Sequence, residues 1–141
     1  MAVNFSNDNI EFNLKQKTKL KSWIALVTKK EKCVLGTINY SFTSDDSLLK
    51  INIQYLKHNT YTDIITFNYN EGKKIAGDIF ISIDRVKENA SKFETTFEEE
   101  LHRVMIHGVL HLCGYKDKTK TDSDLMRKKE NASLRLLKQA K

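Results

Sequence analysis

The feature that most constrains this chain is the stretch 107–117, which reads HGVLHLCGYKD. The surrounding pattern predicts a helix, so His107 and His111, four residues apart, leave the same face one turn apart. Gly114 follows where such a helix would end, and Asp117 lies on the returning chain. Two imidazoles and a carboxylate brought together across a helix end predict a site for one divalent metal ion, with zinc (Zn2+) favoured.

Other side chains near this stretch fit the metal site less well. On a helix that turns about 100° per residue, Cys113 points about 200° away from His111, and His102 also lies on the wrong side. We therefore interpret Cys113 as a core thiol and His102 as an ordinary histidine. Asp122 and Asp124 stay open as alternative third ligands, because they lie within reach of the same polar loop.

Composition places the chain in a broad class. A length of 141 residues with 40% hydrophobic residues suits one domain over 1–141. No apolar run approaches the ~18 residues of a membrane span, and the first ten residues do not form a secretory signal. We therefore expect a cytoplasmic protein that does not enter a membrane.

The positive charge is concentrated next to the candidate metal site. The net charge is +6, and the segment 116–141 holds nine basic and four acidic residues. A basic surface beside a metal centre favours a polyanionic partner, of which nucleic acid is the commonest. The alternative is a lysine-rich helix face that only contacts solvent.

Hydrophobic periodicity predicts the order of elements. Strands are expected at 2–6, 33–42, 63–69 and 75–82, and helices at about 15–30, 45–56, 84–92, 96–113 and 122–139. This order predicts an α+β fold with a small mixed β-sheet of about four strands, helices mainly on one face, and a central, buried metal-binding helix. We expect the first two crossovers to give parallel strands, and the hairpin to add an antiparallel strand at an edge.

Two protein families share this spacing of histidines. The pattern HxxxHxxGxxD resembles the zinc-binding stretch of metzincin peptidases, but Gly108 occupies the position of their catalytic glutamate. The whole stretch 107–117 more closely resembles the YbeY family of endoribonucleases, whose signature is H-G-x-L-H-L-x-G-Y-D-H. The resemblance extends to TDIITF at 62–67 and GDI at 77–79.

The YbeY resemblance implies an activity and partners. It implies a metal-dependent endoribonuclease specific for single-stranded RNA, acting on the 3′ end of small-subunit ribosomal RNA and in ribosome quality control. His107 and His111 match the first two metal ligands of the family, and Asp117 stands where the third is usually histidine. The implied partners are ribosomal RNA, the small ribosomal subunit and possible proteins of ribosome maturation.

The chain departs from the family at a second position. The family usually has an arginine where this chain has Leu56, and Lys57 or His58 could supply the missing cation for RNA binding. Arg103 and Lys57 are candidates for contacting the RNA backbone near the reacting bond. In this hypothesis the metal lowers the pKa of a water to about 7, and no general base is evident in the motif.

Two other functions remain open at this stage. The first is a metal-dependent hydrolase of another substrate, such as a zincin-like peptidase, although Gly108 argues against it. The second is a non-catalytic ribosome-assembly factor in which a structural metal fixes the loop 114–122 to the helix.

Overall fold

The computed structural model describes residues 2–139. Its elements are β1 (Ala2–Asn7), α1 (Lys17–Lys30), β2 (Val34–Thr43), α2 (Asp45–Leu56), β3 (Ile64–Asn68), β4 (Lys74–Ser82), α3 (Ile83–Lys92), α4 (Phe97–Leu112) and α5 (Lys120–Gln139). All nine predicted elements are present within two residues of the expected bounds. The predicted α+β fold class is therefore confirmed.

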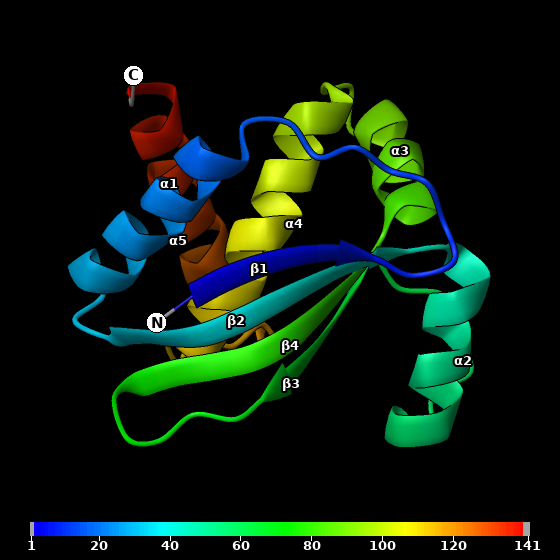
Figure 1. Ribbon diagram of the computed structural model, residues 1–141, viewed down its shortest axis with the longest axis horizontal. Coiled ribbons are helices and arrows are strands. Elements are labelled where there is room, and N and C mark those ends of the chain that lie inside the picture. Colours follow the sequence, from blue (N-terminus) through cyan, green and yellow to red (C-terminus); the bar gives the residue numbers. More distant parts are fainter. Residues whose placement is uncertain (1, 140–141) are drawn as a thin grey trace.

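The four strands form one mixed sheet in the order β1-β2-β4-β3 (Figure 1). β1 pairs with β2 and β2 pairs with β4 in parallel, whereas β3 pairs with β4 antiparallel. The expectation that the second crossover gives a parallel strand is wrong, because β3 runs antiparallel at the sheet edge. The inner position next to β2 is taken by β4, whose Ile75, Ile79 and Ile81 share one face of the sheet and are all 0% exposed.

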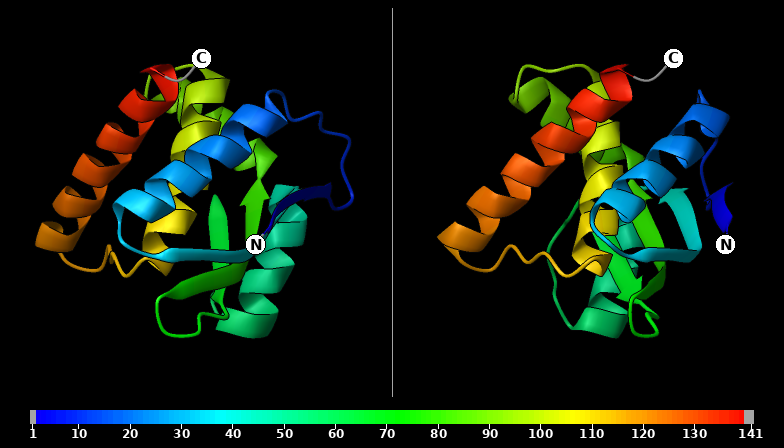
Figure 2. Two further views of the ribbon diagram at one scale, coloured as in Figure 1. Left: turned by 60° about the vertical axis from the view of Figure 1, so that its left-hand side comes forward. Right: turned by 90° about the vertical axis from the view of Figure 1, so that its left-hand side faces the viewer.

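The helices lie mainly on one face of the sheet, as predicted. Helices α1, α3, α4 and α5 gather together, whereas α2 lies apart from them (Figures 1 and 2). The ring of Tyr55 on α2 packs edge-on against Phe67 of β3, and Phe67 packs edge-on against Phe80 of β4. Both phenylalanines lie on the sheet face that is turned away from α4. Alternation along β3 and β4 places Ile64, Ile79 and Ile81 on the face toward α4, whereas Ile65 shares the face of Phe67 and Phe80.

Helix α4 is the central element of the core. The Tyr40 hydroxyl on β2 donates to the carbonyl of Met105 at 2.8 Å. A Cβ added to Gly108 would lie 2.9 Å from Ile79 Cδ1 and 3.1 Å from Ile64 Cδ1. The glycine therefore lets α4 lie directly on the sheet. Although α4 is buried, no helix in residues 2–139 combines the length and hydrophobicity of a membrane span.

Candidate functional site

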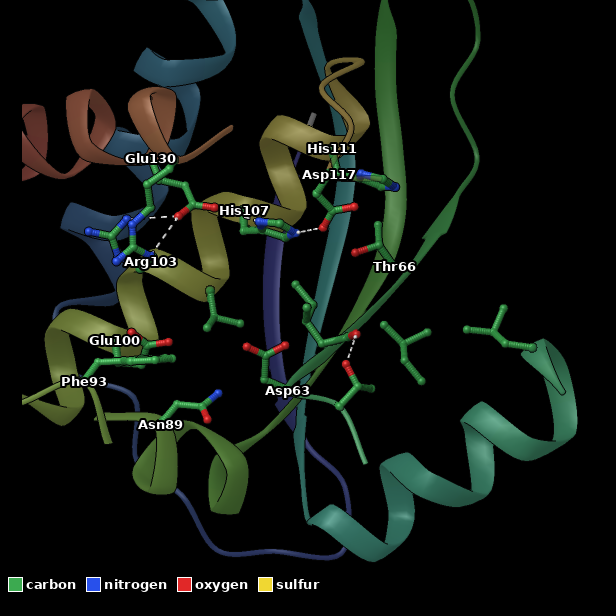
Figure 3. A pocket seen from close by; sticks show the side chains of 16 residues that line it. Asp63, Thr66, Asn89, Phe93, Glu100, Arg103, His107, His111, Asp117 and Glu130 are labelled. Atoms are coloured by element: carbon green, nitrogen blue, oxygen red, sulfur yellow. Dashed lines mark hydrogen bonds and ion pairs between the residues drawn. The ribbon is translucent and has the colours of Figure 1, made fainter. Parts of the chain in front are cut away.

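A cleft of about 570 Å³ opens between α4, β3 and α5. Figure 3 shows that His107, His111 and Asp117 lie at one end and that Glu100, Asn89 and Phe93 lie at the other. The lining residues come from six segments of the chain: Leu56, Thr62, Asp63, Ile64, Ile65, Thr66, Asn89, Phe93, Glu100, Arg103, Val104, His107, His111, Asp117, Arg127 and Glu130.

His107 is held between two carboxylates. Its Nδ1 lies 2.7 Å from Glu130 Oε2 on α5, and its Nε2 lies 3.3 Å from Asp117 Oδ2. When Nδ1–H donates to Glu130 in the neutral ring, Nε2 carries only a lone pair. That lone pair then faces a carboxylate oxygen, which also has no hydrogen. The pair of acceptors requires a proton or a cation between them.

The charges around His107 also affect its protonation. Burial by itself would lower the pKa of His107, but the hydrogen bond and charge of Glu130, with the charges of Asp117 and Asp63, raise it above its ordinary value. A site that attracts a proton to Nε2 attracts a metal ion for the same electrostatic reason. Metal and proton therefore compete for this nitrogen.

The separation of Nε2 and the Asp117 carboxylate fits shared zinc ligation. Two ligand atoms about 2.0–2.1 Å from a tetrahedral zinc ion lie about 3.3 Å apart, and the observed distance is 3.3 Å. A ligating histidine whose other nitrogen donates to a carboxylate, here Glu130, is also the usual arrangement at protein metal sites.

His111 stands slightly apart from the other two predicted ligands. The rings of His107 and His111 are nearly parallel, with centroids 6.4 Å apart, and the carboxylate of Asp117 lies between them in Figure 3. Within residues 2–139 no three His, Cys, Asp or Glu side chains are arranged to enclose a metal ion. The structure thus brings His107 and Asp117 together and leaves His111 adjacent and exposed. The full ligand set stays a prediction.

The loop that carries Asp117 is fixed at several points. Gly114 has φ of 108°, which lets the chain reverse directly after α4. The hydroxyl of Tyr115 donates to the carboxylate of Glu31 at the end of α1, and Ser123 Oγ donates to the carbonyl of Asp117 at 3.1 Å. The carboxylate of Asp117 is therefore held beside His107 by contacts to α1 and α5.

Arginines supply the positive charge of the cleft. Arg103 donates from Nη1 to Glu130 Oε1 at 3.0 Å and from Nη2 to Asn131 Oδ1 at 2.8 Å, so its guanidinium is already occupied. Arg127 was not identified from the sequence, yet its side chain lines the cleft and is 60% exposed. Arg127 lies three residues before Glu130, on the same face of α5. This spacing places Arg127 in the cleft only once α5 is known to pack against α4.

Two acids in the cleft were also missed. Glu100 is only 6% exposed, and burial, with the charge of Asp63, raises the pKa of its carboxyl. Burial likewise raises the pKa of Asp63. Glu100 precedes His107 by seven residues, which is about two helical turns, so helical periodicity could have placed it on the face of the histidines.

The remaining candidates lie outside the cleft. Lys57 ends α2 in a left-handed conformation with φ of 57° and is exposed, and neither it nor His58 lines the cleft. Leu56 does line it and is 44% exposed. The ring of His102 packs edge-on against Trp23 on another side of α4, which agrees with its interpretation as an ordinary histidine.

Known proteins share this fold and sequence. The sequence model of the family described as Endoribonuclease YbeY matches residues 2–138. An Endoribonuclease YbeY of Flavobacterium psychrophilum is 53% identical over 130 residues, which cover 92% of this chain and 93% of that protein. The Endoribonuclease YbeY of Cytophaga hutchinsonii is 50% identical over 138 residues, with 97% and 96% covered.

A solved structure shows the same architecture. The solution structure of a Thermotoga maritima protein superimposes with a TM-score of 0.67 at 29% identity, covering 96% of this chain and 89% of that one. The protein is thus of the α+β class built around a buried, histidine-bearing helix. This chain belongs to the YbeY family of endoribonucleases.

Proposed function

We propose that this protein is a zinc-dependent endoribonuclease that cleaves single-stranded RNA, with the ion held by His107, His111 and Asp117. The observation that carries the metal is the 3.3 Å approach of His107 Nε2 to Asp117 Oδ2, with Nδ1 already bound by Glu130. When bound, zinc supplies the Lewis acidity that activates water and polarises a phosphoryl oxygen. Because Asp117 replaces a neutral imidazole, the site carries one more negative charge and accepts a broader range of divalent metals.

The residues of the cleft have separate roles in this proposal. Glu130 holds the ring of His107 and keeps the proton on Nδ1. Arg127 is exposed and contacts the RNA backbone, which gives it the role expected of the arginine that this chain lacks at Leu56. Arg103 acts indirectly, because its guanidinium fixes the carboxylate of Glu130.

The family and the charge both support an RNA as the cellular substrate. We assign the protein to maturation of the 3′ end of small-subunit ribosomal RNA and to ribosome quality control, in the cytoplasm. The basic segment 116–141 supports a polyanionic substrate, and relatives that carry the name endoribonuclease support RNA. Lys57 and His58, exposed beyond the cleft, stay candidates for contacts with a longer RNA.

A peptidase is less well supported. Gly108 occupies the position of the catalytic glutamate of such enzymes, and here that position faces Ile79 and Ile64 of the sheet rather than the cleft. The non-catalytic assembly factor differs from our proposal only in whether the metallated protein cuts RNA.

The experiment that tests the proposal combines metal analysis with cleavage assays. Purified protein is incubated with a single-stranded RNA and with the same sequence annealed to its complement. We expect about one zinc per chain and cleavage of the single strand, and we expect His111→Ala to lose both together. His102→Gln is the control, because His102 lies outside the cleft. Cleavage by a metal-free protein would overturn the mechanism, and a metallated protein that binds ribosomal RNA without cutting it would indicate the assembly factor.

A further inference from the structure

The end of the cleft away from His107 contains a buried carboxylate without a partner. Glu100 is 6% exposed and lines the cleft, and within residues 2–139 its carboxylate forms no hydrogen bond or ion pair. Arg103, three residues further along α4, directs its guanidinium to Glu130 and Asn131 instead. Within residues 2–139 the fully buried side-chain atoms without a hydrogen-bond partner belong to Thr43 and Arg85, so the carboxylate of Glu100 is open to the cleft. A carboxylate that lines a cleft without a donor from the protein suits a ligand that donates hydrogen bonds.

Asn89 of α3 and Phe93, which caps the C-terminus of α3, line the same end of the cleft as this carboxylate (Figure 3). The side-chain amide of Asn89 has no hydrogen-bond partner within the described part of the chain, although the residue is only half-buried. Phe93 is 54% exposed, and Lys92 Nζ lies over its ring at 5.8 Å from the centroid, so part of the aromatic surface is available at the cleft wall.

The chemistry of this end suits a nucleobase better than a phosphate. Glu100 and Asp63 are both acidic, which disfavours a phosphate beside them, and the cations that act on Glu100, Arg103 and Arg127, direct their guanidinium groups to Glu130. Single-stranded RNA presents unstacked bases, which proteins hold by stacking on aromatic rings and by hydrogen bonds to the base edge. An exposed ring, a free acceptor and a free amide together match those requirements.

We infer that Glu100, Asn89 and Phe93 form a nucleobase subsite of the cleft that prefers guanine. The Watson–Crick edge of guanine presents two adjacent N–H donors, N1 and N2, which match the two oxygens of the Glu100 carboxylate. Its O6 accepts from the amide of Asn89, and its face stacks on the ring of Phe93. Uracil has one N–H between two carbonyls, so it leaves one carboxylate oxygen opposite an acceptor. The inference rests on the proposed function, because it names the base that the RNA substrate places at the end of the cleft away from the candidate metal site.

Nucleotide titrations test this subsite without any cleavage. The metal-loaded full-length protein is titrated with the 5′-monophosphates of guanosine, adenosine, cytidine and uridine, while the NMR signals of the Asn89 amide and the Phe93 ring are followed. Because all four share ribose and phosphate, differences between them report the base. We expect the guanine nucleotide to shift both signals and to bind about tenfold more tightly than the uridine nucleotide, as for one bidentate contact to a base.

Two variants and a matched control complete the test. Glu100→Gln keeps the size of the side chain. It should remove the guanine preference by lowering the affinity for the guanine nucleotide about tenfold. Phe93→Leu, at an exposed position, should lower the affinity for all four nucleotides about fivefold or more, because base stacking on the ring is lost. Glu98→Gln makes the same charge change at an exposed position of the same helix and should change nothing.

Three other outcomes would refute the proposed subsite. They are that no nucleotide shifts the NMR signals of Asn89 or Phe93, that the four nucleotides bind with equal affinity, or that Glu100→Gln has the same affinities as Glu98→Gln. Failure of the proposed function looks different, because it removes RNA cleavage by the wild-type protein and leaves the guanine titration as predicted.

Discussion

His107 Nδ1 lies 2.7 Å from a carboxylate oxygen of Glu130, although the two residues are 23 positions apart in the chain. The other oxygen of the same carboxylate accepts from Arg103 at 3.0 Å. One carboxylate of α5 thus fixes both a histidine and an arginine of α4. The orientation of His107 is therefore decided by a helix that contains none of the three proposed ligands His107, His111 and Asp117.

The first prediction concerns this carboxylate. Glu130→Gln should weaken zinc binding by about 10–100-fold, because partners of this kind orient and polarise a ligating histidine. Competition with a chromophoric chelator measures the affinity. Asp124→Asn should leave the affinity unchanged, because Asp124 is an exposed acid of the same helix that pairs with Lys120 and does not line the cleft. An unchanged affinity in Glu130→Gln would show that the contact only packs α5 against α4.

The second prediction concerns the exposed arginine of the cleft. Arg127→Ala should weaken binding of single-stranded RNA of any sequence. It should also lower the slope of log affinity against log salt concentration by about one, because one fewer phosphate is neutralised. The free energy of unfolding should change by less than about 0.5 kcal/mol, because the side chain is 60% exposed. Fluorescence titrations at several salt concentrations give both quantities. Arg135→Ala, an exposed position of the same helix, is the control, and equal salt slopes for the two variants would contradict the assignment.

The third prediction is a pH dependence of stability. Burial, with the charge of Asp63, raises the pKa of Glu100 above its ordinary value of 4.5. The folded protein then binds this proton more tightly than the unfolded chain does. The stability associated with Glu100 is therefore complete below the unfolded pKa, and it is lost as pH rises through the folded pKa.

Glu100→Gln removes this titration. The variant should be more stable than the wild type at pH 7, and the two should converge near pH 3.5, where the carboxyl is protonated in both states. Urea unfolding at the two pH values measures the difference. A stability difference of the same size at both would show that packing, and not charge, is responsible. A gain in stability with a loss of guanine binding would be the trade-off expected of a functional carboxylate.

The fourth prediction compares Gly77 of β4 with Gly108 of α4. A Cβ on Gly77 would lie 2.4 Å from the carbonyl oxygen of Phe67 on the neighbouring strand, whereas a Cβ on Gly108 would meet only the ends of Ile79 and Ile64. Gly77→Ala should lower the free energy of unfolding by about 3 kcal/mol or more, because the two strands must separate. Gly108→Ala should cost about 1 kcal/mol, since the helix propensity of alanine offsets part of the overpacking. Thermal and urea unfolding check the order, and a larger loss in Gly108→Ala would contradict it.

Much of the fold could be predicted from local pattern. The nine elements follow from hydrophobic periodicity and from capping residues such as Thr96, whose hydroxyl accepts from the backbone N–H of Glu99. The order of strands could not be predicted in full. In the sheet β4, and not β3, lies next to β2. Pairing between distant strands leaves little trace in the local sequence, so this order could not be predicted.

The stretch HGVLHLCGYKD by itself determined that His107 and His111 share a face of a buried helix and that Asp117 follows a turn at Gly114, because helix geometry and glycine conformation act over a few residues. Only the tertiary structure decided what surrounds them. Glu130 and Arg127 reach the cleft because α5 packs on α4, and Asn89 and Phe93 line the same cleft as Glu100 because α3 also packs on α4. These contacts are set by the burial of apolar surface far apart in the chain, which has no fixed spacing in the sequence.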